Sequence, residues 1–211
     1  MRIYFVGSHA TGKTTLCRYV SQNYGLPMIS EVARSVLAEM ESSFDAMRTD
    51  MDLVAQYQRQ VFARQVATEK QHSSAFVSDR AFDNLAYAAD HTTIFADMVA
   101  DSGFAEYMKW VSKGVVFFLR PHKSLLVDDG VRSPDRWLQR RFQASVEGLV
   151  HREVPPELVA FLPALGDFEA RMAWMGDLLS ESGTAPGFQV DDPSSSATSP
   201  GNKAATASVG G

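Results

Sequence analysis

The sequence predicts an α/β fold in which a parallel sheet of five strands is covered by helices on both faces. Short apolar segments rich in Val, Ile and Phe alternate with longer segments of helical periodicity, as is typical of parallel sheets. The apolar segments carry few polar residues, which is expected of strands buried on both sides. The chain has 211 residues, 45% of them hydrophobic, and is long enough to bury such a core.

The expected elements follow one another in a regular order. Strands are expected at 2–6, 27–29, 75–78, 115–119 and 158–161. Helices are expected at about 14–23, 31–40, 51–71, 81–90, 93–112, 134–151 and 167–180. Ligands of parallel sheets bind beyond the carboxyl ends of the strands. The residues that follow each strand are therefore the candidates for function.

The segment after the first strand has the sequence of a phosphate-binding loop. It contains the pattern G-x-x-x-x-G-K-[ST] between a strand and a helix, and consists of Gly7, Ser8, His9, Ala10, Thr11, Gly12, Lys13, Thr14 and Thr15. In such loops the backbone N–H groups and the following helix N-terminus bind phosphate oxygens. Lys13 is expected to reach the β- and γ-phosphates of ATP, and the Thr14 hydroxyl to ligate Mg²⁺. A glycine-rich turn that binds nothing is the structural alternative, but strand, spacing, Lys and Thr all favour a P-loop NTPase fold.

An acidic residue follows the third expected strand. Asp79 directly follows the apolar segment 75–78, and it is expected to be the second protein contact of Mg²⁺, as in other P-loop enzymes. Arg80 is expected beside the transferred phosphoryl group, and Asp83 lies one turn further on. In a purely structural interpretation, Asp79 is a helix N-cap and Arg80 is a solvated side chain.

Glu31, after the second expected strand, has two interpretations. In the functional one, the first two strands flank the switch point of the sheet, so that Glu31 lies beside the phosphate loop and accepts the proton of an attacking hydroxyl. Arg34 would then hold a substrate anion. In the structural one, Ser30 caps a helix and Glu31 stabilises its first turn. The sequence leaves open whether Glu31 or Asp79 orients the acceptor.

A basic segment follows the fourth strand. Residues 128–136 combine an Asp-Gly turn with Ser-Pro, which is typical of a helix start. Arg132 and Arg136, with Arg140 one turn on, are expected to form a helical lid that closes over ATP and neutralises charge in the transition state. A solvated basic helix is the alternative. After the fifth strand, residues 163–167 are candidates for covering the adenine ring.

Composition argues against several classes of protein. No apolar segment approaches the roughly 20 residues that span a bilayer, and we expect no signal sequence before the first strand. The net charge of −5 argues against nucleic-acid binding through bulk charge. The single cysteine, Cys17, excludes an internal disulfide and favours a packing role in a cytoplasmic protein, in the host cytoplasm if the source is viral. Residues 182–211 are expected to be a disordered tail that follows a folded domain at 1–181.

Taken together, these motifs resemble the small P-loop kinases related to thymidylate kinase, deoxynucleoside kinases and nicotinamide riboside kinase. The sequence is most similar to the compact AAA-like ATPase/kinase members common in bacteriophages, over about residues 1–180. The resemblance implies a P-loop kinase domain at 1–181 with ATP and Mg²⁺ as cofactors. It also implies an acceptor site around Glu31, Arg34, Asp79 and Arg80, with a lid at 122–137. One branch of the group is implied to phosphorylate 5-hydroxymethyluracil in phage DNA, a step towards hypermodified thymine.

The leading hypothesis is therefore a kinase, acting as a monomer or homodimer. It would transfer the γ-phosphoryl group of ATP to a hydroxyl of a nucleoside- or nucleotide-type acceptor, either a free molecule or a modified base in DNA. The alternative is a switch or motor ATPase that acts on nucleic acid without phosphorylating it. A guanine-specific switch would carry Asn-Lys-x-Asp, which the sequence lacks, and about 180 folded residues scarcely accommodate a motor's sensor region. A pure nucleotide-binding module is a third hypothesis.

Overall fold

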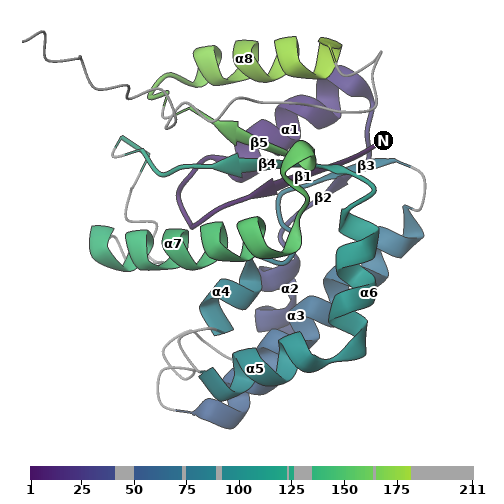
Figure 1. Cartoon of the computed structure of the whole chain (residues 1–211), viewed down its shortest axis with the longest axis vertical. Helices are drawn as coiled ribbons and strands as arrows, with labels where there is room; N and C mark the ends of the chain where they lie inside the picture. Colours follow the sequence, from purple (N-terminus) through teal and green to yellow (C-terminus); the bar gives the residue numbers. More distant parts are fainter. Residues whose placement is uncertain are drawn as a thin grey trace, which may run out of the picture.

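A parallel sheet of five strands forms the centre of the molecule, between two layers of helices (Figure 1). The computed structural model describes residues 1–40, 50–72, 75–88, 92–122, 124–125, 135–163 and 165–181. The strands are β1 (Arg2–Val6), β2 (Met28–Ile29), β3 (Phe76–Ser78), β4 (Val115–Leu119) and β5 (Val159–Leu162). Every pairing is parallel, in the order β2-β3-β1-β4-β5, so all carboxyl ends lie at one edge. The α/β fold class predicted from the sequence is confirmed.

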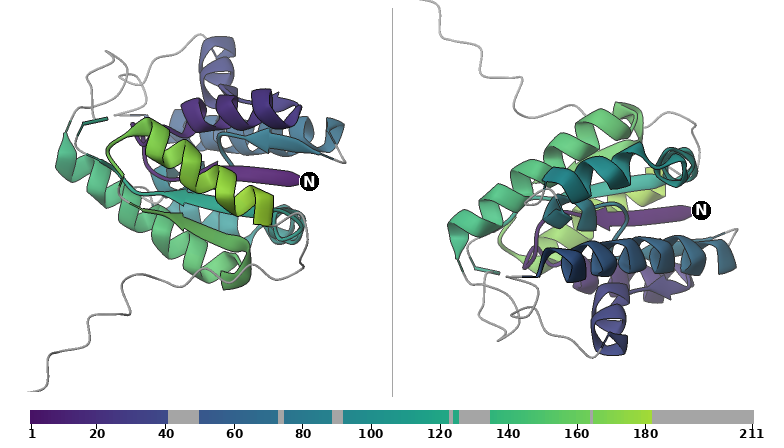
Figure 2. Two further views of the ribbon diagram at one scale, coloured as in Figure 1. Left: turned by 90° about the horizontal axis from the view of Figure 1, so that it is seen from above. Right: turned by 90° about the horizontal axis from the view of Figure 1, so that it is seen from below.

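Two groups of helices cover the two faces of the sheet (Figure 2). One face carries the first and last helices, α1 (Lys13–Tyr24) and α8 (Phe168–Glu181). The opposite face carries α2 (Val32–Glu39), α3 (Met51–Gln71), α4 (Asn84–Ala88), α5 (Thr92–Ala100), α6 (Ser102–Val111) and α7 (Arg136–Glu153). A short 3₁₀ turn, Pro156–Leu158, leads from α7 into β5. Among the described residues, no helix is both long and apolar enough to cross a bilayer.

The central strand β1 is buried on both sides because its side chains alternate between two cores. Tyr4 and Val6 pack in the larger core with the α2–α7 layer. Ile3 and Phe5 pack in the smaller core with α1 and α8. Cys17 is fully buried in this second core, and its burial raises the pKa of the thiol. The continuous apolar run of β1 thus reflects two buried faces, as expected of a central parallel strand.

Three expected helices differ from those observed. The expected helix 93–112 is two helices, because Asp101 lies between them and accepts a hydrogen bond from Gly103 N at 2.7 Å as the N-cap of α6. The helix expected from residue 81 begins at Asn84, because the Asp83 carboxylate accepts from Ala81 N at 2.9 Å and holds a turn. The helix expected from residue 134 begins at Arg136, and Asp135 is its N-cap.

The observed strand order corrects one expectation about the site. The first two strands are not neighbours, since β3 lies between β1 and β2. The chain leaves β1 towards the face covered by α1, whereas it leaves β3 and β4 towards the opposite face. In such sheets, ligands bind at the carboxyl edge where neighbouring connections diverge in this way. That position is the end of β1, between the segments that follow β3 and β4.

Candidate active site

The phosphate loop, residues 7–15, connects β1 to α1 at this edge of the sheet. Gly7 has φ 147° and Gly12 has φ 87°, both of which side chains disfavour. A Cβ at Gly7 would also lie only 2.6 Å from the Leu119 carbonyl oxygen, so the loop needs glycine there. Gly12 is the N-cap of α1, and the positive end of that helix lies at the loop. The backbone therefore has the conformation that the phosphate-binding motif requires.

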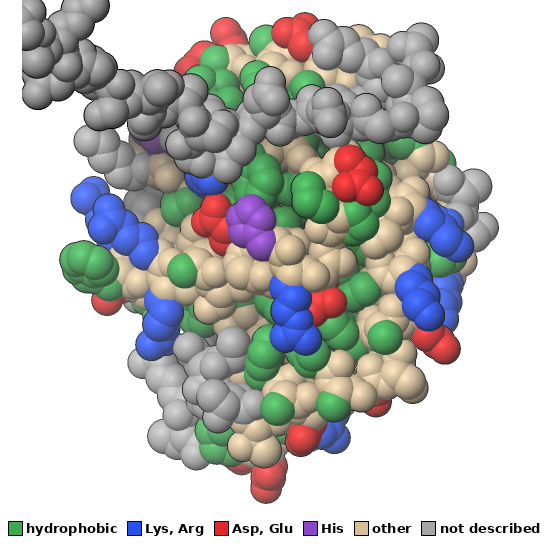
Figure 3. Space-filling model, in the orientation of Figure 1, with side chains coloured by type: hydrophobic (Ala, Val, Ile, Leu, Met, Phe, Trp, Pro, Cys, Tyr) green, Lys and Arg blue, Asp and Glu red, His purple; other side chains and the backbone are tan. Residues whose placement is uncertain are grey.

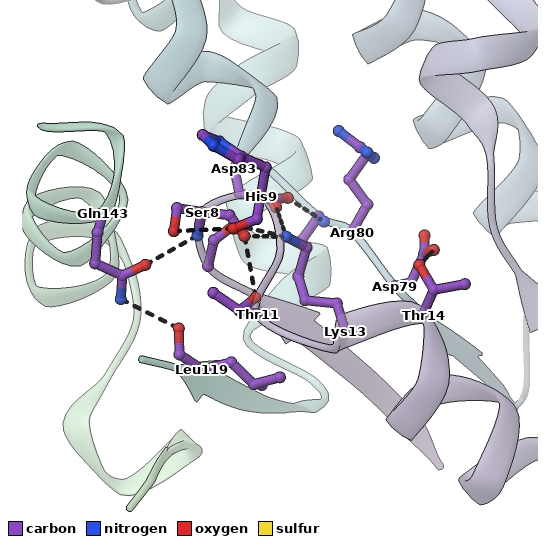
Figure 4. A network of polar contacts seen from close by, with 12 residues as sticks. Ser8, His9, Thr11, Lys13, Thr14, Asp79, Arg80, Asp83, Leu119 and Gln143 are labelled. Atoms are coloured by element: carbon purple, nitrogen blue, oxygen red, sulfur yellow. Dashed lines mark hydrogen bonds and ion pairs between the residues drawn. The ribbon is translucent and has the colours of Figure 1, made fainter. Parts of the chain in front are cut away.

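The ammonium group of Lys13 folds back over the loop (Figure 4). Its Nζ donates hydrogen bonds to Gly7 O at 2.8 Å and to Ser8 O at 2.7 Å. The Asp83 carboxylate, only 1% exposed, lies 3.9 Å from the same nitrogen. A cation held in this way lies close to the loop amides, where it can neutralise phosphate oxygens.

Thr14 and Asp79 meet between the first turn of α1 and the end of β3. The Thr14 Oγ1 donates a hydrogen bond to Asp79 Oδ2 at 2.7 Å. Magnesium binds hydroxyl and carboxylate oxygens and usually takes its remaining ligands from water and substrate phosphates. The described residues contain no cluster of three or more acidic, His or Cys side chains that could enclose a metal by themselves. This oxygen pair beside a phosphate loop fits a magnesium ion that is shared with a nucleotide.

A side chain of α3, Gln65, helps to hold the turn that carries Asp79 and Arg80. The Ser78 Oγ donates to the Arg80 carbonyl at 2.6 Å, and Gln65 Nε2 lies within hydrogen-bond distance of both Ser78 Oγ (3.0 Å) and the Arg80 carbonyl (3.3 Å). Gln65 Nε2 also donates to the buried Glu69 carboxylate at 2.7 Å. The structure therefore holds the segment after β3 by side-chain contacts to its backbone.

Side chains from the opposite faces of the sheet hold the phosphate loop in place. On α7, Gln139 Nε2 donates to His9 O at 2.8 Å. Gln143 accepts from Ser8 N at 2.9 Å and donates to Leu119 O at 3.1 Å (Figure 4). On α8, Arg171 Nη1 donates to Thr11 O at 2.8 Å. Gln139 and Arg171 thus hold carbonyls of the loop, and Gln143 holds the Ser8 amide, so side chains of the protein itself fix the shape of the loop.

The sequence interpretation missed Gln139, Gln143 and Arg171. The two glutamines are buried one turn apart on the face of α7 that also carries Phe142 and Val146. Two amides within an otherwise apolar helix face were the available signal, because buried amides need partners. The fully buried Arg171 gave no local signal, since a single Arg in a helix is usually solvated.

The structure separates Glu31 from the phosphate loop by one strand. Glu31 lies at the end of β2, with β3 between it and β1. Its side chain is 46% exposed and forms an ion pair with Arg34 at 3.1 Å. Glu31, and not Ser30, is the N-cap of α2, and it has a left-handed φ of 59° without a side-chain cap bond. A non-glycine residue in this conformation is strained, and such strain is common at functional sites.

The expected lid is described only in part. Arg132 lies outside the described residues, as do Ser133 and Pro134. Arg136 is the exposed first residue of α7, one turn before Gln139, which binds the phosphate loop. The guanidinium of Arg140 lies over the Trp137 ring at 5.2 Å. Basic side chains gather on the solvent-facing side of α7 (Figure 3). Arg140, one turn after Arg136, is thus stacked on the exposed Trp137.

Comparisons with known proteins agree with this architecture. The solved structure of deoxyadenosine kinase from M. mycoides has a TM-score of 0.63 at 15% identity, over 86% of this chain and 100% of that one. A NadR protein in complex with NR gives 0.66 at 18% identity, over 90% of this chain and 54% of that one. Shikimate kinase from Aquifex aeolicus gives 0.54 at 14% identity, over 87% and 99%. At these identities the likeness concerns the fold, and it confirms the resemblance to small P-loop kinases at that level.

The sequence itself matches a protein family. A search of curated proteins finds no significant relative. A family model described as an AAA domain matches residues 2–169, from β1 into the start of α8. That match spans the phosphate loop, the Thr14–Asp79 pair and both glutamines of α7, and it covers most of the chain. The chain belongs to this AAA domain family.

Proposed function

We propose that this protein is a cytoplasmic, ATP-dependent kinase that transfers the γ-phosphoryl group to a hydroxyl of a nucleoside- or nucleotide-type acceptor. The observation that carries the proposal is the meeting of Lys13, the Thr14–Asp79 pair and Asp83 at one phosphate loop. A glycine-rich turn that binds nothing has no need of a lysine, a hydroxyl–carboxylate pair and a buried carboxylate around the same loop. Phosphoryl transfer needs both charge neutralisation and orientation of the attacking hydroxyl.

Each part of the loop has a defined role in this proposal. The loop amides and the N-terminus of α1 bind the β- and γ-phosphates, and Lys13 neutralises their charge. Thr14 and Asp79 would hold Mg²⁺, which would supply positive charge next to the phosphates. Because Gln139 and Arg171 already fix the carbonyls of the loop, its amides are oriented before the nucleotide arrives.

The acceptor site is assigned to the segments that follow β2 and β3. With Asp79 proposed for the metal, Glu31 at the end of β2 is the other acid proposed to orient the acceptor hydroxyl, with Arg34 beside it. Arg80 lies directly after Asp79 in the turn held by Gln65, next to the expected position of the transferred group. Arg132 and Arg136, before and at the start of α7, would supply the remaining positive charge when ATP is bound.

The acceptor itself is best identified by labelling. The protein is incubated with Mg²⁺, γ-labelled ATP and a panel of nucleosides, nucleotides and DNA with or without 5-hydroxymethyluracil. The proposal expects label on at least one hydroxyl-bearing member of the panel. A free nucleoside, a nucleotide and a base in DNA are the three acceptors that the experiment separates. Stimulated ATP hydrolysis with DNA, and no labelled acceptor, would instead support a motor or switch ATPase.

The Lys13→Ala variant tests whether transfer takes place at this loop. Removal of the ammonium group should reduce transfer at least about a hundredfold, because electrostatic stabilisation of the transferred group depends on it. Circular dichroism should remain that of the wild type, since the Lys13 side chain is bonded to carbonyls of the phosphate loop and does not belong to either apolar core. Transfer at the wild-type rate in Lys13→Ala would disprove the assignment of the site.

A further inference from the structure

Arg171 is a buried cation whose hydrogen-bond partners, among the residues that the structure describes, are backbone carbonyls. The residue is 1% exposed, and its Nε and Nη1 donate to Leu165 O at 2.6 Å and Thr11 O at 2.8 Å. Among the described residues, no carboxylate forms an ion pair with it, and its buried Nη2 has no hydrogen-bond partner. Burial lowers the pKa of the guanidinium, which nevertheless stays charged at neutral pH. A buried charge without a counter-charge is costly, so its position calls for an explanation.

The guanidinium lies where positive potential is already high. Gly12 caps α1, and a Cβ built on it would be 3.5 Å from Arg171 Nη1. The N-terminus of a helix carries partial positive charge, so a cation placed there is unfavourable unless an anion is also bound. The carboxylates beside the phosphate loop, Asp79 and Asp83, are engaged by Thr14 and by Ala81 N and Lys13. Asp167, one turn before Arg171, caps the backbone of Glu169 and Ala170. A polyphosphate in the loop would supply the missing negative charge.

A single peptide group connects Arg171 to the inside of the loop. Arg171 binds the carbonyl of the Thr11–Gly12 peptide, which is trans, as are all described peptides. In a trans peptide the N–H points away from the C=O, so the Gly12 amide points away from Arg171. Hydrogen bonds in series polarise one another, so a cation on the carbonyl makes the amide a stronger donor. The amides of such loops are the groups that bind phosphate.

We propose that Arg171 is a positioning residue of the nucleotide site, whose charge increases affinity for the triphosphate through the Thr11–Gly12 peptide without touching the phosphates. The inference rests on the proposed function only in taking ATP as the ligand. Gln139 makes the corresponding contact to His9 O with a neutral amide, so Arg171 is distinguished by its charge. The hydrogen bond from Arg171 Nε to Leu165 O also ties this side chain to the segment after β5, and it holds the guanidinium in place against Thr11 O.

Binding of ATP, ADP and AMP to charge variants tests this proposal. Arg171→Gln removes the charge but keeps a donor for Thr11 O, whereas Arg171→Lys keeps the charge. Calorimetry should show that Arg171→Gln weakens ATP binding about tenfold, ADP less and AMP least, because the effect follows the phosphate charge. Arg171→Lys should recover most of the ATP affinity. Arg152→Gln, at a position 62% exposed at the far end of α7, is the matched control and should bind like the wild type.

The ratio of affinities distinguishes a charge effect from simple packing. An equal loss for ATP, ADP and AMP in Arg171→Gln, or no loss at all, would overturn the proposal. If Arg171→Gln does not fold, Arg171→Lys decides the question: the proposal requires a wild-type ratio of ATP to AMP affinity, and a tenfold lower ratio refutes it. Failure of the proposed function is a separate outcome, because wild-type protein would then transfer no label.

Discussion

The bond between Thr14 and Asp79 is the residue-scale feature on which the metal assignment depends. These two side chains are 65 positions apart in the chain, and they meet only because β3 lies directly beside β1. The hydroxyl and the carboxylate are also the oxygen types that Mg²⁺ prefers. An acid that serves the metal should affect the reaction through magnesium and leave the fold unchanged.

Replacement of Asp79 by Asn should therefore change the magnesium dependence of the reaction. The amide oxygen can still accept the Thr14 hydrogen bond, but the negative charge is lost. We expect the Mg²⁺ concentration for half-maximal transfer to rise about tenfold or more, since charge count sets affinity for hard cations. Initial rates over a magnesium titration measure this effect. Asp97→Asn, at a position 58% exposed, is the control, and an unchanged titration in Asp79→Asn would contradict the assignment.

Residues of the site were predictable from the sequence where the chemistry is local in the chain. The phosphate loop is one continuous segment, and Asp79 directly follows an apolar strand, so spacing alone indicated both. Gln139 and Arg171 were not predictable, because they reach loop carbonyls from 130 and 160 positions away. No periodicity in α7 or α8 encodes which backbone group such a side chain will meet, since that depends on how both helices pack on the sheet.

At the scale of elements, one buried carboxylate joins β1, α3 and α6. Glu69 is fully buried and accepts hydrogen bonds from Tyr4, Gln65, Tyr107 and Trp110, at distances of 2.7 to 3.0 Å. Burial raises the pKa of Glu69, while these hydrogen bonds oppose the shift. Because Gln65 also binds the Arg80 carbonyl, the cluster supports the turn at the active site as well as the core.

Glu69→Gln should destabilise the fold. Each carboxylate oxygen of Glu69 accepts from one tyrosine hydroxyl and one nitrogen donor. The NH₂ group of Gln would replace one of these oxygens. The tyrosine hydroxyl can rotate to accept from it, but Gln65 Nε2 and Trp110 Nε1 can only donate. We expect a loss of about 2 kcal/mol in the free energy of unfolding, the usual cost of an unsatisfied buried group. Urea denaturation should show a lower midpoint with an unchanged m-value. Glu106→Gln on the exposed side of α6 is the matched control, and equal midpoints for the two variants would contradict this role.

Element types were predictable from the sequence, but their neighbours in the sheet were not. The strands and most helices follow from local apolar patterns, and all five predicted strands overlap those observed. The strand order does not follow from such patterns, because β2 and β3 are both short apolar strands and either could pair with β1. Long-range packing decides, and it places Asp79 rather than Glu31 beside the phosphate loop.

At the scale of the whole molecule, the phosphate loop is held from both helical layers. Gln139 and Gln143 reach it from α7 on one face of the sheet, and Arg171 reaches it from α8 on the other. The last helix is thus part of the site as well as of the smaller core, where Met175 and Leu179 are buried. Because helices of both layers hydrogen-bond to the loop, a nucleotide that binds there should also stabilise the folded state of the whole domain.

This arrangement predicts where the chain can be shortened. Arg171, Met175 and Leu179 all precede Glu181, the last residue of α8. Residues 182–211 contain only Phe188, Val190 and Val209 as large apolar side chains, so we propose that they add no core. A chain that ends at Glu181 should therefore melt within about 2 °C of the full chain and bind ATP within about twofold.

A second truncation shows whether the measurement is sensitive enough. A chain that ends at Asp167 lacks all of α8, and with it the Arg171 bond to Thr11 and the buried Met175 and Leu179. It should melt at least about 10 °C lower than the full chain, because several kcal/mol of apolar burial are lost, and its ATP binding should be undetectable. Thermal melts and calorimetry of the three chains measure both effects. If the chain that ends at Glu181 shows the same lower melting temperature and loss of ATP binding as the shorter chain, residues 182–211 belong to the folded domain. The boundary proposed at residue 181 is then wrong.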